Sequence, residues 1–174
     1  RALEQNFFGL GAANVVFFSQ GTLPCLTTDG KIMLESAGRV AEAPDGNGGI
    51  YRALHRSGSI ADMQRRGVKY IHAFAVDNAV CKVADPMWIG YGIETKAETG
   101  CKVLTKSSPD EKIGALCRKA GKFAVVEYSD IDEVNKNKRN PDGSFTFRAG
   151  FVCMLFYHID FLKNKCKPQS LPRQ

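Results

Sequence analysis

The sequence lacks any long apolar run. Its longest stretch without a formal charge, residues 5–28, is interrupted by glycine, asparagine, glutamine and proline, whereas a membrane-spanning helix needs about 20 consecutive apolar residues. No basic segment followed by an apolar one resembles a secretory signal. We therefore expect no membrane helix and no membrane partner.

The sequence also lacks the patterns of several common metal, redox and phosphate sites. None of its six cysteines forms a Cys-x-x-Cys pair, which excludes zinc ribbons and redox motifs of that type. A chain of 174 residues does not need disulfides to build a core, so reduced thiols and a cytoplasmic location are expected. The three histidines show no spacing typical of a metal site, and no GxxxxGK[ST] phosphate loop is present.

Basic residues are concentrated near the end of the chain. The formal net charge is +6, and four of these excess charges follow Asp160 without an intervening acid, at Lys163, Lys165, Lys167 and Arg173. Aromatic residues are not interleaved with this run, so nucleic-acid binding is not predicted.

Strand-like and helix-like segments alternate along the chain. Helices are predicted after the glycine-rich turn at residues 44–49 and from Pro86 to about Lys96, where Asp85 can act as the N-cap. Strands are predicted at 14–20, 31–34, 69–76, 102–105, 122–128 and 150–157. This alternation predicts an α/β fold with a mostly parallel sheet covered by helices.

Polar residues follow three of these predicted strands. They are Gln20, the pair Asp77-Asn78 and the pair Glu127-Tyr128. Ligands bind beyond the carboxyl ends of the strands in such sheets. Asp77 could provide an oxygen ligand for Mg²⁺, although a lone aspartate at a strand end more often caps the next turn.

The strongest local signal is the turn PDGNGG at residues 44–49. Its glycines allow positive φ and close approach of a ligand, and the helix that follows offers unpaired N–H groups to an anion. A nucleotide or a sugar phosphate could bind there. The alternative is a plain turn in which Asp45 or Asn47 caps the helix, and for a glycine-rich turn alone this alternative is the more common one.

Four segments, in this order and spacing, resemble eukaryotic UDP-N-acetylglucosamine pyrophosphorylases and the related UDP-sugar pyrophosphorylases. The segments are FFSQGTLPCL (17–26), APDGNGGIYRAL (43–54), VDNAVCKVADP (76–86) and VVEYSDI (125–131). The resemblance covers nearly the whole chain. It implies a Rossmann-like (GT-A-like) nucleotidyltransferase fold and the reaction of UTP with N-acetylglucosamine 1-phosphate to give UDP-N-acetylglucosamine and pyrophosphate.

The resemblance also implies roles for individual residues. The sugar contacts would be Asn47, Glu127 and Tyr128. Asp77 would be the catalytic residue and would bind Mg²⁺ or Mn²⁺. The nucleotide contacts would be Gln20, Gly46 and Asp77.

The sequence departs from the family pattern in two respects. The upstream phosphate-binding loop and two downstream lysines have no counterpart, so residues 1–174 look like the central part of a single catalytic domain, which is expected to be inactive alone. Arg148 and Phe151 also stand where relatives have asparagine, and the second of these asparagines contacts the sugar. A non-catalytic nucleotide-sugar-binding homologue, or an enzyme with altered sugar preference, is therefore the alternative.

Overall fold

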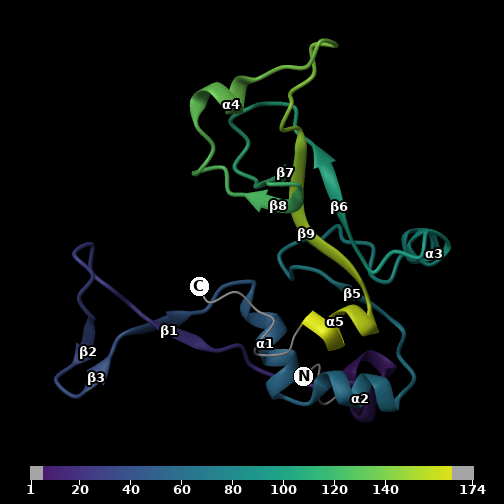
Figure 1. Cartoon of the computed structure of the whole chain (residues 1–174). Coiled ribbons are helices and arrows are strands. Elements are labelled where there is room, and N and C mark those ends of the chain that lie inside the picture. The colour runs from purple at the N-terminus through teal and green to yellow at the C-terminus, as the bar shows by residue number, and fades with distance from the viewer. Residues whose placement is uncertain (1–5, 166–174) are drawn as a thin grey trace. The chain divides into compact units, whose positions relative to one another are not determined.

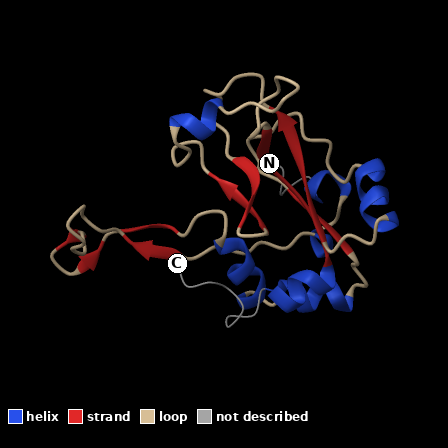
Figure 2. Cartoon of the chain, turned by 45° about the horizontal axis from the view of Figure 1, so that its top comes forward, coloured by secondary structure: helices blue, strands red, loops and turns tan. Residues whose placement is uncertain are grey.

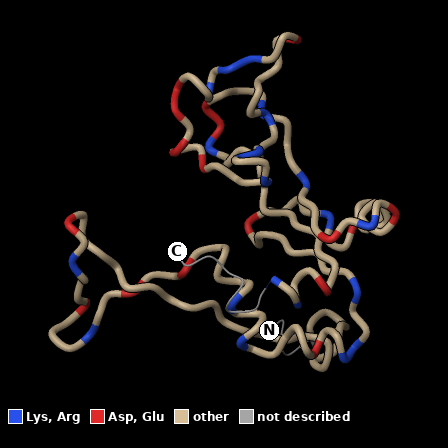
Figure 3. The backbone as a smooth tube through the Cα atoms, in the orientation of Figure 1, with Lys and Arg blue, Asp and Glu red and all other residues tan. Residues whose placement is uncertain are grey.

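The computed structural model describes residues 6–165, which divide into two compact units (Figure 1). Unit 1 combines residues 1–69 with 159–174, and unit 2 comprises residues 70–158. Cys166, Lys167 and Arg173 of the expected basic tail lie outside the described residues. Figure 3 shows Lys and Arg spread over many elements of both units. Within residues 6–165, no helix is both long and apolar enough to cross a membrane.

Unit 1 contains a small helical core. Helices α1 (Gly49–Arg56), α2 (Ser59–Arg65) and α5 (Ile159–Lys165) pack together (Figure 2). Two short 3-10 helices, η1 (Asn6–Gly9) and η2 (Ala12–Asn14), precede them in the chain. The buried apolar side chains of this core are Ala53, Ile60, Ile159 and Leu162.

Short antiparallel pairs make up the rest of unit 1. Strand β1 (Thr22–Pro24) pairs with β4 (Glu42–Pro44), and β2 (Leu34–Ser36) pairs with β3 (Arg39–Val40). The strand predicted at 14–20 is wrong, because Asn14 ends η2 and residues 15–21 pair with no strand of the described chain.

Unit 2 is a five-stranded sheet built around one long central strand, β9 (Ala149–His158). Strands β5 (Tyr70–Ala73) and β6 (Thr99–Thr105) pair with opposite sides of β9, since residues 155–157 of β9 are paired with both. Strand β7 (Ala115–Lys119) pairs with β9 at Gly150 and with β8 (Lys122–Val126).

The prediction of a mostly parallel sheet is wrong for this sheet, in which every described strand pair is antiparallel. The predicted alternation is nevertheless present: β5 leads through helix α3 (Pro86–Glu94) to β6, and these two strands run in the same direction. They do not pair because β9, from much later in the chain, lies between them. The apolar run in β9 is explained by its central place in the sheet, and this explanation requires no parallel neighbour.

The predicted start of the helix at Pro86 is confirmed. The Asp85 carboxylate accepts a hydrogen bond from the Met87 N–H at 3.2 Å, and Pro86 occupies the first turn, where its missing N–H costs nothing. The second helix of unit 2, α4 (Glu133–Asn137), is capped in the same way by Asp132.

Helix α3 packs against β9 through Phe156, which is 1% exposed. The Phe156 ring lies 5.8 Å from that of Tyr70 and 6.3 Å from that of Trp88. A Cβ atom on Gly92 would come within 2.7 Å of the Phe156 ring, so only glycine lets the helix approach this closely.

We predict that Gly92→Ala lowers the free energy of unfolding by about 1–3 kcal/mol, the usual cost of overpacking a core. Gly90→Ala on the same helix is the matched control, because its Cβ would meet no atom within 4 Å. It should stabilise the helix by about 1 kcal/mol. Thermal unfolding of both variants measures the difference, and equal midpoints would contradict the packing described.

Candidate active site

In unit 1 the structure brings Gln20 to the glycine-rich turn. The Gln20 side-chain amide donates to the Gly46 carbonyl at 2.5 Å and to the Asp45 carboxylate at 3.2 Å. The Gln20 Oε1 accepts no hydrogen bond from the described residues, which leaves an acceptor for an N–H donor such as that of a uracil ring. Gln20 and Gly46, both expected from the resemblance to contact the nucleotide, are hydrogen-bonded to each other.

The conformation of the turn depends on its glycines. Gly46 has φ +73°, and Gly21 and Gly49 both lie close to the Asp45 carboxylate. A Cβ on Gly21 would be 3.1 Å from Asp45 Oδ2, and one on Gly49 would overlap the carboxylate. Alanine at Gly49 would therefore displace Asp45 from Gln20.

The suggested capping role of Asp45 or Asn47 is wrong. The N-cap of α1 is Gly48, and no side chain caps this helix end by a hydrogen bond. The N–H groups of Gly46 and Gly48 donate to no atom of the described residues and remain available to a ligand. Asn47, the predicted sugar contact, lies between them and is exposed.

An open cavity of about 590 Å³ adjoins Gln20 and Asp45 within unit 1. Phe17 lines it, as do Arg52 and Arg56, which are one turn apart on α1. The two guanidinium groups make this wall of the cavity favourable for an anion.

In unit 2, Asp77 and Glu127 both act on the thiol of Cys153. The pKa of Cys153 is raised, first by burial and then by the negative charges of Asp77 and Glu127. Asp77 lies in the turn after β5, and Glu127 directly follows β8. Glu127 is also close to Gly114, because a Cβ there would be 3.6 Å from Glu127 Oε2. Both carboxylates, expected from the sequence to bind the metal and the sugar, therefore influence the same thiol electrostatically.

Cys153 reaches this position because β9 contains a bulge. The register between β6 and β9 shifts between Lys102 and Val103, whose partners are Met154 and Phe151. Cys153 falls in the gap and has φ +52°, a conformation that non-glycine residues rarely adopt. Bulges of this kind occur next to active sites, where they redirect a side chain.

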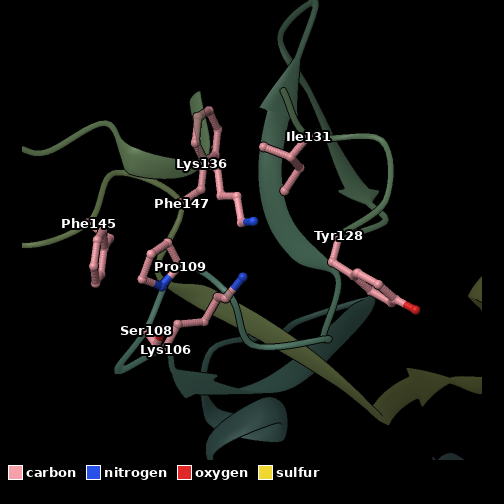
Figure 4. Close-up of a pocket in the computed structure, with 8 residues that line it drawn as sticks. All are labelled: Lys106, Ser108, Pro109, Tyr128, Ile131, Lys136, Phe145 and Phe147. Carbon is pink, nitrogen blue, oxygen red and sulfur yellow. The ribbon is translucent and has the colours of Figure 1, made fainter. Parts of the chain in front are cut away.

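Tyr128, the third predicted sugar contact, lines a small pocket together with Lys106 and Lys136 (Figure 4). The two ammonium groups point into the pocket, whereas the Tyr128 hydroxyl points away from them. The free space of about 10 Å³ suits about one water molecule and is too small for a sugar. A sugar contact of Tyr128 would have to lie outside this pocket.

Asp77 is the carboxylate that the resemblance assigns to a metal ion. No group of three or more His, Cys, Asp or Glu side chains within residues 6–165 is placed to hold a metal ion. A single carboxylate could hold Mg²⁺ only together with substrate phosphates, which commonly complete the coordination of this ion.

Two residues near these groups were not predicted as site residues. Asp45 was considered only as a helix cap, although its place inside the glycine-rich turn could have indicated a contact with Gln20. Cys153 lies in an apolar run that suggested a structural thiol, and nothing in the sequence indicates the bulge.

The α/β fold is that of the UDP-sugar pyrophosphorylases. The structure is similar, with a TM-score of 0.86, to the uridine diphosphate N-acetylglucosamine pyrophosphorylase of Trypanosoma brucei, which is 30% identical; the match covers 98% of this chain and 34% of that one. The profile of the UTP–glucose-1-phosphate uridylyltransferase family matches residues 2–172, and the chain belongs to this family.

Curated relatives agree with this assignment. The chain is 46% identical to the human UDP-N-acetylhexosamine pyrophosphorylase-like protein 1, over 92% of this chain and 32% of that protein. It is 42% identical to UDP-N-acetylglucosamine diphosphorylase 2 of Arabidopsis thaliana, over 91% of this chain and 32% of that protein. The chain therefore spans about a third of the length of the relatives it matches.

The charge environment of Cys153 predicts its reactivity. Removing a nearby negative charge lowers the pKa of a thiol, so Glu127→Gln should speed alkylation of Cys153 by iodoacetamide about 2- to 5-fold near neutral pH. Glu133→Gln on α4, where the carboxylate pairs with Lys136, is the control and should change nothing. Peptide mass spectrometry measures the rate, and equal rates in both variants would contradict the proximity of Glu127 to Cys153.

Proposed function

We propose that the protein containing this chain is a uridylyltransferase that forms UDP-N-acetylglucosamine and pyrophosphate from UTP and N-acetylglucosamine 1-phosphate. The observation that carries this proposal is the hydrogen bonding of Gln20 to Gly46. It fixes an amide acceptor beside a turn in which the N–H groups of Gly46 and Gly48 donate to no described residue. A uracil ring, which has both an N–H donor and carbonyl acceptors, can use both kinds of group. Family membership and the printed names of the relatives support the same reaction.

In the proposed reaction, a phosphate oxygen of the sugar phosphate attacks the α-phosphorus of UTP, and pyrophosphate leaves. Such a transfer needs mainly positioning and charge stabilisation. Gln20 and Gly46 would hold the uracil ring. Asn47 of unit 1 would contact the sugar, and the resemblance assigns Glu127 and Tyr128 of unit 2 to the same ligand.

Asp77 would place Mg²⁺ or Mn²⁺ at the nucleotide phosphates. The bound cation would neutralise the charge that develops on the phosphate oxygens. The Asp77 side chain projects from a turn in which the Asn78 N–H donates to the Ala75 carbonyl and the Ala79 N–H donates to the Asp77 carbonyl. This turn fixes the backbone from which the carboxylate projects.

We also propose that residues 1–174 form the central part of a larger catalytic domain of Rossmann-like type. The chain spans about a third of its relatives. In addition, residues 15–21 pair with no described strand, and Val16 and Phe17 there are 53% and 76% exposed. Further strands of a complete domain would cover such a segment.

Phe151 supports a second candidate, an enzyme with altered sugar preference or a homologue that binds nucleotide sugars without turnover. Phe151 stands where the family has a sugar-binding asparagine, and it lies in β9 with its N–H donated to the Gly114 carbonyl at 2.8 Å. Its side chain is half-buried and offers no hydrogen bond to a sugar.

The test is pyrophosphate release by the complete protein with UTP and each of three sugar 1-phosphates: N-acetylglucosamine, N-acetylgalactosamine and glucose. We expect N-acetylglucosamine 1-phosphate to give the highest kcat/KM, and Asp77→Asn to lower kcat by about 10²-fold or more. Asp29→Asn, in an exposed turn of unit 1, is the control and should be fully active.

Thermal midpoints measured alongside should not differ between Asp77→Asn and the unaltered protein. If the protein turned over none of the three sugar phosphates but still bound UDP-N-acetylglucosamine, the non-catalytic alternative would be favoured. An active Asp77→Asn variant would exclude the role proposed for Asp77.

A further inference from the structure

The segment between β5 and α3, residues 74–85, carries Asp77 and buries little apolar surface. Val76 and Val80 are 97% and 92% exposed, and Val83 is 60% exposed. Burial of apolar side chains therefore contributes little to the position of this segment. Its position must depend on the few polar contacts that attach it to the sheet.

Two such contacts lie at the end of the segment. The Ala84 N–H donates to His72 Nδ1, on β5, at 3.0 Å. The Asp85 carboxylate, 8% exposed, pairs with Lys102 on β6 at 2.8 Å. Ala84 adopts φ +52°, which is unfavourable for a residue with a Cβ, so the hydrogen bond to His72 must offset this strain.

The surroundings of His72 fix its protonation state. Because Nδ1 accepts a hydrogen bond, the proton of the neutral ring is on Nε2. Nε2 is buried and has no hydrogen-bond partner among the described residues. The ring packs against Phe74 at 5.1 Å and meets Trp88 nearly edge-on at 4.9 Å.

A second proton cannot be accommodated without loss of the contact to Ala84. It would bind Nδ1, where the Ala84 N–H already points, and two donors would then face each other. Burial lowers the pKa of His72, the positive charge of Lys102 lowers it further, and Asp85 raises it. The imidazolium ion and the attachment of Ala84 are therefore mutually exclusive.

We propose that His72 is a positioning residue, which holds the segment carrying Asp77 in place only while its imidazole is neutral, so that acidification releases this segment. The importance of the release for catalysis rests on the role proposed above for Asp77. The charged groups near His72 are Lys102 from β6, and Asp85 and Lys82 from the segment itself. Phe74 and Trp88, which contact the ring, are uncharged.

The sign of the effect follows from the lowered pKa. His72 is neutral in the folded state above its lowered pKa, whereas an unfolded histidine takes up its proton near pH 6.5. The stabilising contribution is therefore fully present above about pH 6.5 and is lost as the pH falls through the folded pKa below that value.

Hydrogen exchange of the complete protein tests the proposal without relying on activity. Protection of the peptide spanning residues 76–85, corrected for intrinsic exchange, should fall about 10-fold between roughly pH 8 and pH 5. In His72→Phe, which keeps a packed ring but has no acceptor, protection should be low at every pH. In His72→Asn, the side-chain oxygen can accept from Ala84 and does not titrate, so protection should be high at every pH. His55→Phe, an exposed position on α1, is the control.

Two results would overturn the proposal. One is that protection of this peptide in the unaltered protein does not depend on pH. The other is that protection in His72→Asn changes with pH as it does in the unaltered protein. The pH profile of kcat then tests the link to catalysis. In the unaltered protein, kcat should fall at low pH as His72 takes up a proton. In His72→Asn this fall should be absent. If exchange titrates as expected but kcat shows no such fall, the attachment by His72 stands and the role of Asp77 in the proposed function fails.

Discussion

Unit 2 is organised by the packing of Phe156 in the middle of β9. This side chain is almost fully buried, and it contacts Tyr70 on β5 and Trp88 on α3 while leaving room only for glycine at position 92. Because β9 pairs with β5 on one side and β6 on the other, this one contact fixes α3 against the central strand. The two ends of the segment that carries Asp77, β5 and α3, are held in place by this packing, while the segment itself is attached to the sheet by polar contacts.

The bulge in β9 is the second constraint. It places Cys153 in a strained conformation where the charges of Asp77 and Glu127, which are 50 residues apart in the sequence, both raise the pKa of its thiol. Residues held in unfavourable dihedral angles persist only where the surrounding structure imposes them, and they are frequent at functional sites. In unit 1 the close packing lies at the Asp45 carboxylate, which is near Gly21 and Gly49 and accepts a hydrogen bond from Gln20.

Much of the local structure could be predicted from the sequence, because helix caps and apolar runs depend only on neighbouring residues. The helix at Pro86, with its Asp85 cap, and the apolar strand that became β9 are both present. The direction of the sheet could not be predicted, since the strand between β5 and β6 comes from more than forty residues later in the chain. For the site, Gln20 was selected as the end of a predicted strand that the structure does not contain, and the turn was selected for its glycines; the hydrogen bond between Gln20 and Gly46 joins them. Cys153 and His72 were not selected, because a bulge and a buried ring leave no pattern in the sequence.

In the proposed function, Gln20 recognises the uridine and Asn47 the sugar of one nucleotide sugar. Calorimetric titration of the complete protein with UDP and with UDP-N-acetylglucosamine tests it most directly. Gln20→Ala should weaken binding of both ligands, by about 10- to 100-fold if a buried partner loses its hydrogen bond. Asn47→Ala should weaken UDP-N-acetylglucosamine and leave UDP unchanged. Equal losses for both ligands in both variants, or unchanged UDP binding in Gln20→Ala, would contradict the account.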